Sequence, residues 1–161
     1  MSDDKVDKVW SIMDDIKICM MTTRDDDVLR ARPMQAVVRK DEDAVYFFAD
    51  VRDHKDEEVW AHPETCLAFQ SESSKTYLSV SGRTIMLNDR AKMEELFVPA
   101  AKAYFPDGTD DPNLRLLRFT PEQGEYWDSH SSRIVTAVKM ATAMVTGERP
   151  DLGDNEKVRA I

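Results

Sequence analysis

The chain has 161 residues, of which 42% are hydrophobic and 33% charged, and this composition indicates one soluble globular domain with its own core. Its formal net charge is −9. Such an acidic surface argues against nucleic acid or an anionic membrane as the main partner, because both are bound through basic surfaces. We therefore expect neither partner, although a local basic pocket could still hold a phosphate.

Targeting signals and cysteine usage both point to an intracellular protein. The segment Met1–Lys5 lacks the basic and apolar regions of a secretory signal. No apolar run reaches the roughly 20 residues that span a bilayer. Cys19 and Cys66 lie in apolar, strand-like runs without a CxxC pair, so we expect buried thiols rather than a disulfide or redox pair. The expected location is the cytoplasm.

Hydrophobic periodicity predicts a helix followed by strands joined by short turns. Val6, Val9, Trp10, Met13 and Ile16 recur at helical spacing after a polar segment that can cap a helix. The expected strands in the first part of the chain are residues 18–23, 28–38 and 44–49. Short polar turns separate them, which favours an antiparallel meander.

The second part of the chain alternates strands with helices. We expect a short helix over Asp53–Ala61, since the residue before Pro63 is disfavoured in a helix. The further elements expected are strands over 65–71, 76–88, 114–120 and 124–127 and helices over 89–105 and 132–145. Gly82 marks a bulge or a close backbone approach, and Pro99 can kink or divide its helix. We expect one domain over residues 1–147 and an irregular, polar tail over 148–161.

Sequence motifs for nucleophilic, metal or nucleotide chemistry are missing from the chain. The serines beside His130 lack a GxSxG elbow, and the histidines have neither an HExxH nor a CxxC companion. The five glycines form neither a GxGxxG motif nor a P-loop. We therefore predict no catalytic side chain, no metal ligand and no Rossmann nucleotide site.

Basic residues on two neighbouring strands provide the main indication of a ligand site. Arg30 and Arg32 share one strand face, whereas Arg52 and Lys55 follow the next strand. Lys55 lies where a strand gives way to the expected helix, whose N-terminus would attract a phosphate. Arginine can add directional, bidentate hydrogen bonds. Ordinary surface charge is the alternative, and it is the better interpretation for Arg30 or Arg52 alone.

Several segments together resemble the pyridoxamine-phosphate-oxidase-like superfamily, in its general-stress-protein branch of flavin-binding split barrels. The segments are, in order, Arg32-Pro33-Met34, residues 47–55, Ser79-Val80-Ser81-Gly82, residues 104–108, residues 116–121, Glu125-Tyr126-Trp127-Asp128 and Thr146-Gly147. They extend over nearly the whole chain. Each segment is weak alone, but their order and spacing together are fairly specific.

This resemblance implies a mainly β protein with flanking helices, built as a six-stranded antiparallel split β-barrel. It also implies a homodimer with FMN at the subunit interface. Arg32, Pro33 and Met34 would lie along the flavin edge, Phe48, Ala49 and Asp50 beneath the isoalloxazine, and Lys55 at the phosphate. Tyr77 and Ser79 occupy the strand that faces flavin in related proteins. Trp127 would close the pocket, from this subunit or its partner, or pack at the dimer interface.

Two positions depart from the pattern of the family. Ala49 and Asp53 stand where the family usually carries threonine and serine, so two hydroxyl donors are missing. Asp53 would also add negative charge near a dianionic phosphate. Three alternatives remain open: Asp53 caps a helix and points outward, Arg52 or His54 supplies donors, or the chain binds flavin weakly or binds another ligand.

The expected function is that of an FMN-binding general-stress-type protein, a flavin-dependent oxidoreductase of unknown substrate. FMN would bring the redox chemistry, while the protein positions the ring. The alternatives are a non-catalytic module for flavin binding, flavin storage or stress response, and a dimer that has lost FMN. Deazaflavin F420 is an alternative cofactor. We do not expect pyridoxamine phosphate oxidation, because residues 147–153 do not resemble the substrate-binding segment of that enzyme.

Overall fold

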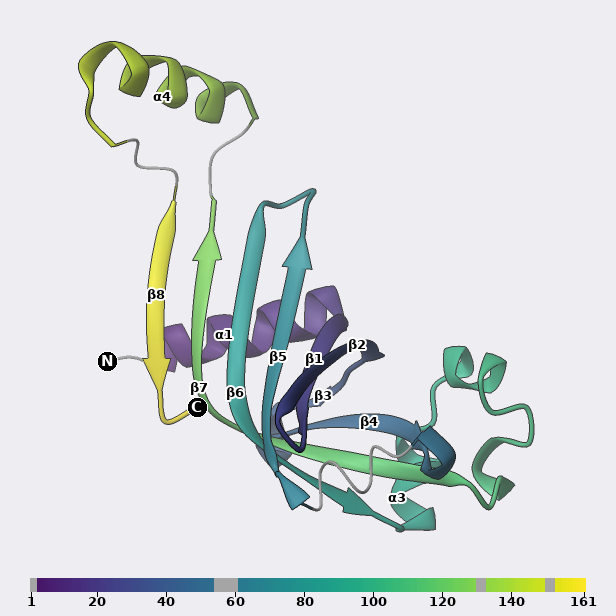
Figure 1. Ribbon diagram of the computed structural model, residues 1–161. Helices are drawn as coiled ribbons and strands as arrows, with labels where there is room; N and C mark the ends of the chain where they lie inside the picture. The colour runs from purple at the N-terminus through teal and green to yellow at the C-terminus, as the bar shows by residue number, and fades with distance from the viewer. Residues whose placement is uncertain (1–2, 54–60, 130–132, 150–152) are drawn as a thin grey trace.

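In the part of the chain that the structure describes, eight strands form one antiparallel sheet (Figure 1). The structure is a computed structural model and describes residues 3–53, 61–129, 133–149 and 153–161. In chain order the strands are β1 (Ile18–Asp25), β2 (Val28–Gln35), β3 (Val37–Arg39), β4 (Ala44–Asp50), β5 (Glu64–Ser71), β6 (Thr76–Leu87), β7 (Leu114–Asp128) and β8 (Asp154–Arg159). Hydrogen bonds order them β2-β1-β5-β6-β7-β4-β3, with β8 added beside β7. The predicted mainly β, antiparallel class is confirmed.

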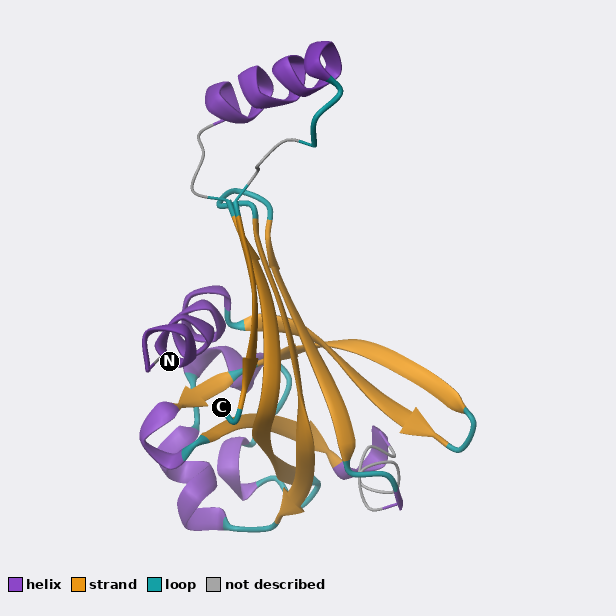
Figure 2. Ribbon diagram, turned by 90° about the vertical axis from the view of Figure 1, so that its left-hand side faces the viewer, coloured by secondary structure: helices purple, strands orange, loops and turns teal. Residues whose placement is uncertain are grey.

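Helices lie at the sides and at one end of this sheet (Figure 2). They are α1 (Asp3–Ile16), α3 (Arg90–Leu96) and α4 (Arg133–Thr146), with 3-10 turns η1 (Lys40–Glu42), η2 (Val51–Asp53), η3 (Pro99–Ala103) and η4 (Gly108–Asp110). The predicted division at Pro99 is confirmed, since α3 ends at Leu96 and Pro99 begins η3. Most of the helix expected over Asp53–Ala61 lies outside the described residues. Within the described part of the chain, no helix has the length and apolar character needed to cross a membrane.

The sheet has eight strands rather than the six of the expected barrel. The strand expected over residues 28–38 is divided at Ala36, whose N–H donates to the carbonyl of Lys17 at 2.7 Å. β2 therefore pairs with β1, while β3 turns away and pairs with β4. The division into β2 and β3 accounts for one of the two extra strands, and the C-terminal strand β8 is the other.

The prediction of an irregular tail was wrong for Asp154–Arg159, which form β8 and pair with β7. Val158 is the buried side chain of this strand, while its other side chains are exposed or half-buried. A strand that presents one apolar side chain to the core gives almost no period-2 signal in the sequence. For this reason the polar composition concealed it.

β7 is a single long strand, although two strands were expected over 114–120 and 124–127. The register against β6 shifts because Gly82 faces Pro121 and Ser81 faces Gln123, which leaves Glu122 as an extra residue. The Glu122 carbonyl instead accepts the N–H of Ala160 at 3.0 Å. This bulge confirms the close approach predicted at Gly82, since a Cβ there would lie 2.1 Å from the Thr120 oxygen.

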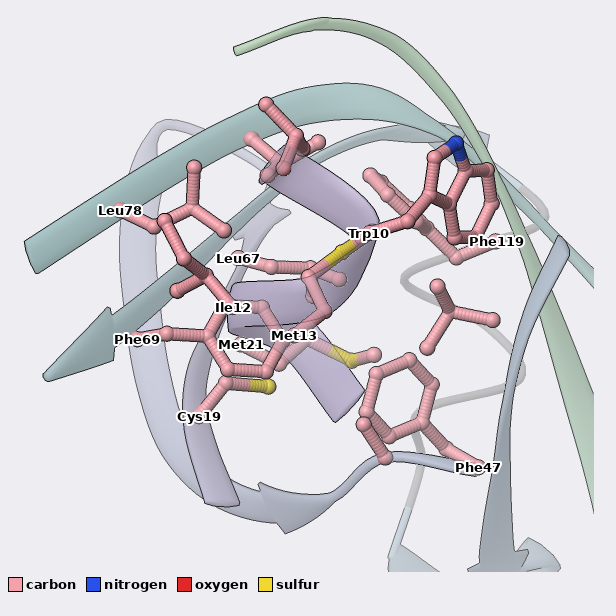
Figure 3. Close-up of a cluster of buried hydrophobic side chains, with 14 of the residues drawn as sticks. Trp10, Ile12, Met13, Cys19, Met21, Phe47, Leu67, Phe69, Leu78 and Phe119 are labelled. Atoms are coloured by element: carbon pink, nitrogen blue, oxygen red, sulfur yellow. The ribbon is translucent and has the colours of Figure 1, made fainter. Parts of the chain in front are cut away.

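Two hydrophobic clusters lie on opposite faces of β4 and β7. The larger cluster packs Trp10 and Met13 of α1 against strand residues such as Phe47 (Figure 3). The smaller one joins Tyr46 to Met93 and Leu96 of α3. β4 therefore buries side chains on both faces, which explains the continuous apolar run of the sequence in place of an alternating pattern.

The cysteines are both free thiols, as expected. Cys19 is buried in the larger cluster, and Cys66 is half-buried. Burial, with a smaller contribution from nearby Cys66, raises the pKa of Cys19 to about 12. Cys19 is therefore a protonated, structural thiol at neutral pH.

We predict that Gly82→Ala lowers the free energy of unfolding by about 1–3 kcal/mol, because the added methyl group meets the backbone of β7. Denaturant unfolding measures the change. Gly124→Ala on β7 is the matched control. Its Cβ would first meet the side-chain tip of Ile161 at 3.0 Å, which can move. Equal losses in both variants would contradict the proposed role of the bulge.

Glu42 connects η1 to β4 and α3 through two short hydrogen bonds. Its carboxylate accepts from the Tyr46 hydroxyl at 2.5 Å and from Lys92 Nζ at 2.6 Å. The bond from Lys92, then that from Tyr46, lowers the pKa of Glu42. A carboxyl group with a lowered pKa in the folded state stabilises the protein above its unfolded pKa of about 4.3. This contribution is lost as the pH falls through the lower folded pKa.

We predict that Glu42→Gln lowers the melting temperature at pH 7 by roughly 2–4 °C. The gap between the variant and the wild type should close as the pH falls below about 4. Thermal unfolding followed by circular dichroism across this range measures it. Glu94→Gln, at an exposed position of α3, is the control. A gap that does not change with pH would contradict the assignment.

Candidate functional site

A cavity of about 510 Å³ opens between strands β1 to β4 on one side and the segment 98–105 on the other. Cavities of roughly 300–1,000 Å³ are typical of small-molecule sites. The residues from the strands are Ile18, Pro33, Met34, Gln35, Val37, Phe48, Ala49 and Asp50. The opposite wall is formed by Val98, Ala101, Tyr104 and Phe105. Most of these side chains are apolar.

The strand wall is held in place by register and by an aromatic contact. Pro33 and Met34 of β2 lie opposite Met20 and Cys19 of β1. Phe48 of β4 makes an edge contact with Phe97, with ring centroids 5.5 Å apart and planes at 74°. Phe97 itself does not line the cavity. The wall therefore presents apolar side chains, including the aromatic ring of Phe48, against which a flat ring system could pack.

The second wall is a series of tight turns after α3. Phe105 N–H donates to the Ala101 carbonyl at 2.9 Å, and Gly108 N–H donates to the Phe105 carbonyl at 2.9 Å. These bonds hold Phe105 in the smaller hydrophobic cluster and keep Ala101 buried. Tyr104 between them remains 81% exposed at the edge of the cavity.

Asp50 is the carboxylate of the cavity wall, and Arg52 binds it closely. The Arg52 backbone N–H donates to Asp50 Oδ1 at 2.8 Å, and its Nε donates to the same oxygen at 2.9 Å. The Arg52 Nη2 forms a further ion pair with Oδ2. The guanidinium therefore compensates the negative charge of Asp50 at the end of β4, beside η2.

Five of the sequence-predicted site residues line this cavity. They are Pro33, Met34, Phe48, Ala49 and Asp50. Arg32 adjoins them on β2, on the same strand face as Met34 and opposite Met21, but it does not line the cavity, and its Nη1 is buried. Lys55 and the serines beside His130 at 131–132 lie outside the described residues.

The other predicted residues lie on β6 and β7 rather than in the cavity. Tyr77 and Trp127 face each other across the two strands and are 38% and 41% exposed. Ser79 lies two residues further along β6, with its hydroxyl 3.5 Å from the Cys66 sulfur. Within one copy of the chain, these three side chains lie on one face of the sheet and do not line the cavity.

The wall at residues 98–105 was missed in the sequence-based prediction of the site. The segment follows the division at Pro99, where periodicity predicts only the end of a helix. Residues 104–108 belong to the segments that resemble the family, but no site residue was assigned to the adjacent aromatic residues Tyr104 and Phe105. Among the described residues, no group of three or more His, Cys, Asp or Glu side chains is arranged to hold a metal ion.

Comparison with known proteins gives the same fold over the whole chain. A structure from Jannaschia sp. CCS1 assigned to general stress protein 26 is 24% identical, covers 98% of this chain and 99% of its own, and superposes with a TM-score of 0.79. A general stress FMN/FAD binding protein from Xanthomonas citri is 26% identical over 78% of this chain and 89% of its own, with a TM-score of 0.69. Protein bli-3 of Neurospora crassa is 24% identical over 91% of this chain and 75% of its own.

The family comparison covers most of the chain, including both walls of the cavity. The family described as pyridoxamine 5'-phosphate oxidase like matches residues 4–151. This range runs from α1 through α4 and contains every residue that lines the cavity. The chain therefore belongs to the pyridoxamine 5'-phosphate oxidase like family.

Proposed function

We propose that the protein is a homodimeric, general-stress-type flavoprotein that binds FMN in this cavity and acts as a flavin-dependent oxidoreductase. The observation that carries the proposal is the position of Pro33, Met34, Phe48, Ala49 and Asp50. The resemblance assigned these residues to flavin, and they line one cavity of suitable size. The relative from Xanthomonas citri, which is described as FMN/FAD binding, supports the choice of cofactor.

The residues present fit a flavin ring better than they define a phosphate site. Met34 and Phe48 supply apolar surface that would hold the isoalloxazine and exclude water. Asp50 is already compensated by Arg52, so it adds little uncompensated negative charge. We assign the phosphate to Lys55 on the basis of the sequence. When bound, the flavin supplies the redox chemistry, and the protein needs no side-chain nucleophile for it.

The homodimer is supported by exposed apolar side chains on one face of the sheet. Pro33, Met20, Ala68 and Ser79 form a row across β2, β1, β5 and β6, because directly opposed residues share a face. The exposed side chains of Ile18, Met20, Tyr77 and Trp127 add large hydrophobic surface. Such contiguous exposed surface is typical of a protein interface. Ile18 and Pro33 also line the cavity, so a partner on this face would meet its rim.

A non-catalytic flavin-binding or storage module remains the second candidate. The observation that favours it is the small number of acid–base groups at the cavity. Of the described residues that line it, Asp50 is the sole carboxylate, and it is bound by Arg52. Turnover with NADH or NADPH as the electron donor would favour the enzyme over the storage module.

We predict that the purified protein carries flavin or takes up added FMN, with a flavin absorption spectrum and quenched flavin fluorescence. Titration with FMN, riboflavin and F420 identifies the preferred ligand. Lys55→Ala should weaken FMN binding at least tenfold and riboflavin binding much less, because riboflavin lacks the phosphate. A colourless protein that also fails to bind added FMN would reject the proposed function. Equal losses for both ligands would reject the role of Lys55.

We predict that Phe48→Leu weakens flavin binding roughly tenfold, because it removes an aromatic wall of the cavity. Phe97→Leu is the matched control, since it removes the same ring contact from the side that does not line the cavity. Both variants should lose similar stability. Isothermal titration measures affinity, and thermal unfolding measures stability. The assignment fails if the two variants bind flavin equally well.

A further inference from the structure

The segment 106–113, which we call the joining loop, makes hydrogen bonds to both walls of the cavity. At its start, the N–H of Gly108 donates at 2.9 Å to the carbonyl of Phe105, which lines the cavity. At its end, the Asn113 carbonyl accepts the N–H of Val51, the residue directly after the strand wall, at 2.9 Å. The position of the joining loop therefore fixes one wall relative to the other.

Few side chains of the turn wall and the joining loop are buried. Among residues 98–113, the buried ones are Ala101, Phe105 and Asp111, and all others are exposed or half-buried. A segment with few buried contacts opens easily unless hydrogen bonds hold it. The bonds that hold the joining loop should therefore decide how far apart the two walls lie.

Arg90, the first residue of α3, supplies two of these bonds from outside the loop. Its Nη1 donates to the carbonyls of Thr109 and Asp111, each at 2.9 Å. Hydrogen bonds from a charged guanidinium are stronger than those between neutral groups. Arg90 is half-buried and does not line the cavity. Its effect on a ligand would therefore pass through the joining loop.

Helix α3 gives Arg90 a fixed base. Met93 and Leu96 of this helix are buried in the smaller hydrophobic cluster. Lys92 Nζ donates to the Glu42 carboxylate at 2.6 Å, which ties the helix to η1. The helix is therefore held by packing and by an ion pair, and Arg90 transmits its position to the joining loop.

Asp111 continues the connection from Arg90 to the strand wall. Its carbonyl accepts from Arg90, while its Oδ1 accepts the N–H of Asn113 at 2.9 Å. Aspartate side chains commonly stabilise turns by such a bond to the backbone two residues on. Asn113 in turn holds Val51. One series of hydrogen bonds therefore runs from α3 to the end of β4, where Asp50 lines the cavity.

We propose that Arg90 is a positioning residue of the cavity, which keeps the two walls at their separation through the joining loop and thereby strengthens flavin binding without touching the flavin. This inference rests on the proposed function and deepens it. A pre-organised cavity binds more tightly than one that its ligand must order. Loss of the two bonds from Arg90 should therefore weaken binding and let water reach the ring.

Hydrogen exchange of the flavin-free protein, followed by NMR, tests the connection itself. Arg90→Met removes both donors and keeps an unbranched side chain. We expect about tenfold faster exchange at the amides of Val51 and Gly108. Arg118→Met is the matched control, because Arg118 donates to the backbone carbonyl of Glu42 at 3.1 Å and neither residue lines the cavity. Unchanged exchange at the two amides, or an equal increase in both variants, would overturn the proposal.

Flavin binding tests the consequence. Arg90→Met should raise the dissociation constant for FMN about tenfold and remove part of the fluorescence quenching of the bound flavin at saturation. Arg118→Met should leave both unchanged. Arg90→Lys, which keeps the charge but loses the planar guanidinium, replaces Arg90→Met if that variant does not fold. Equal affinities in the wild type and the Arg90 variant would overturn the positioning role. If the wild type binds no FMN, the proposed function fails, and the exchange measurement alone decides whether Arg90 fixes the joining loop.

Discussion

The strand β7 pairs with three other strands, and the positions of the cavity walls depend on it. The first half of β7 pairs with β4, and its second half pairs with β8. β6 pairs with both halves of β7 along its other edge. The bulge opposite Gly82 allows one strand to bend between these two halves. Gly82 is required because the Thr120 carbonyl occupies the place of a side chain. The bend separates the part of the sheet that holds the cavity from the part that ends near α4.

The two-sided burial of β4 explains how an apolar cavity can coexist with a stable core. Phe47 points into the cluster with α1, while Tyr46 points into the cluster with α3. The strand is therefore fixed from both faces before it reaches Phe48, Ala49 and Asp50. A ligand site built on such a strand is pre-organised, because packing and not the ligand sets the position of its wall. The turns at 98–105 complete the cavity from the other side.

The sequence predicted the elements with strong periodicity and missed those defined by distant contacts. α1 and β6 follow from apolar spacing, and the division at Pro99 follows from the chemistry of proline. β8 was missed because Val158 is its one fully buried residue, and its place in the sheet depends on pairing with β7. The family resemblance singled out five strand residues that line the cavity, and their role in binding flavin stays a prediction. Tyr77 and Trp127 were expected there too, yet one copy of the chain places them on the exposed face of the sheet.

A crystal structure of the protein grown with FMN tests the central claim most directly. We expect electron density for the isoalloxazine between Met34, Phe48 and the wall at Tyr104, with a second copy of the chain on the face that carries Met20. Flavin bound elsewhere, for instance on the surface of Tyr77 and Trp127 without contact to this cavity, would contradict the account. A cavity that stays empty at saturating FMN would contradict it as well.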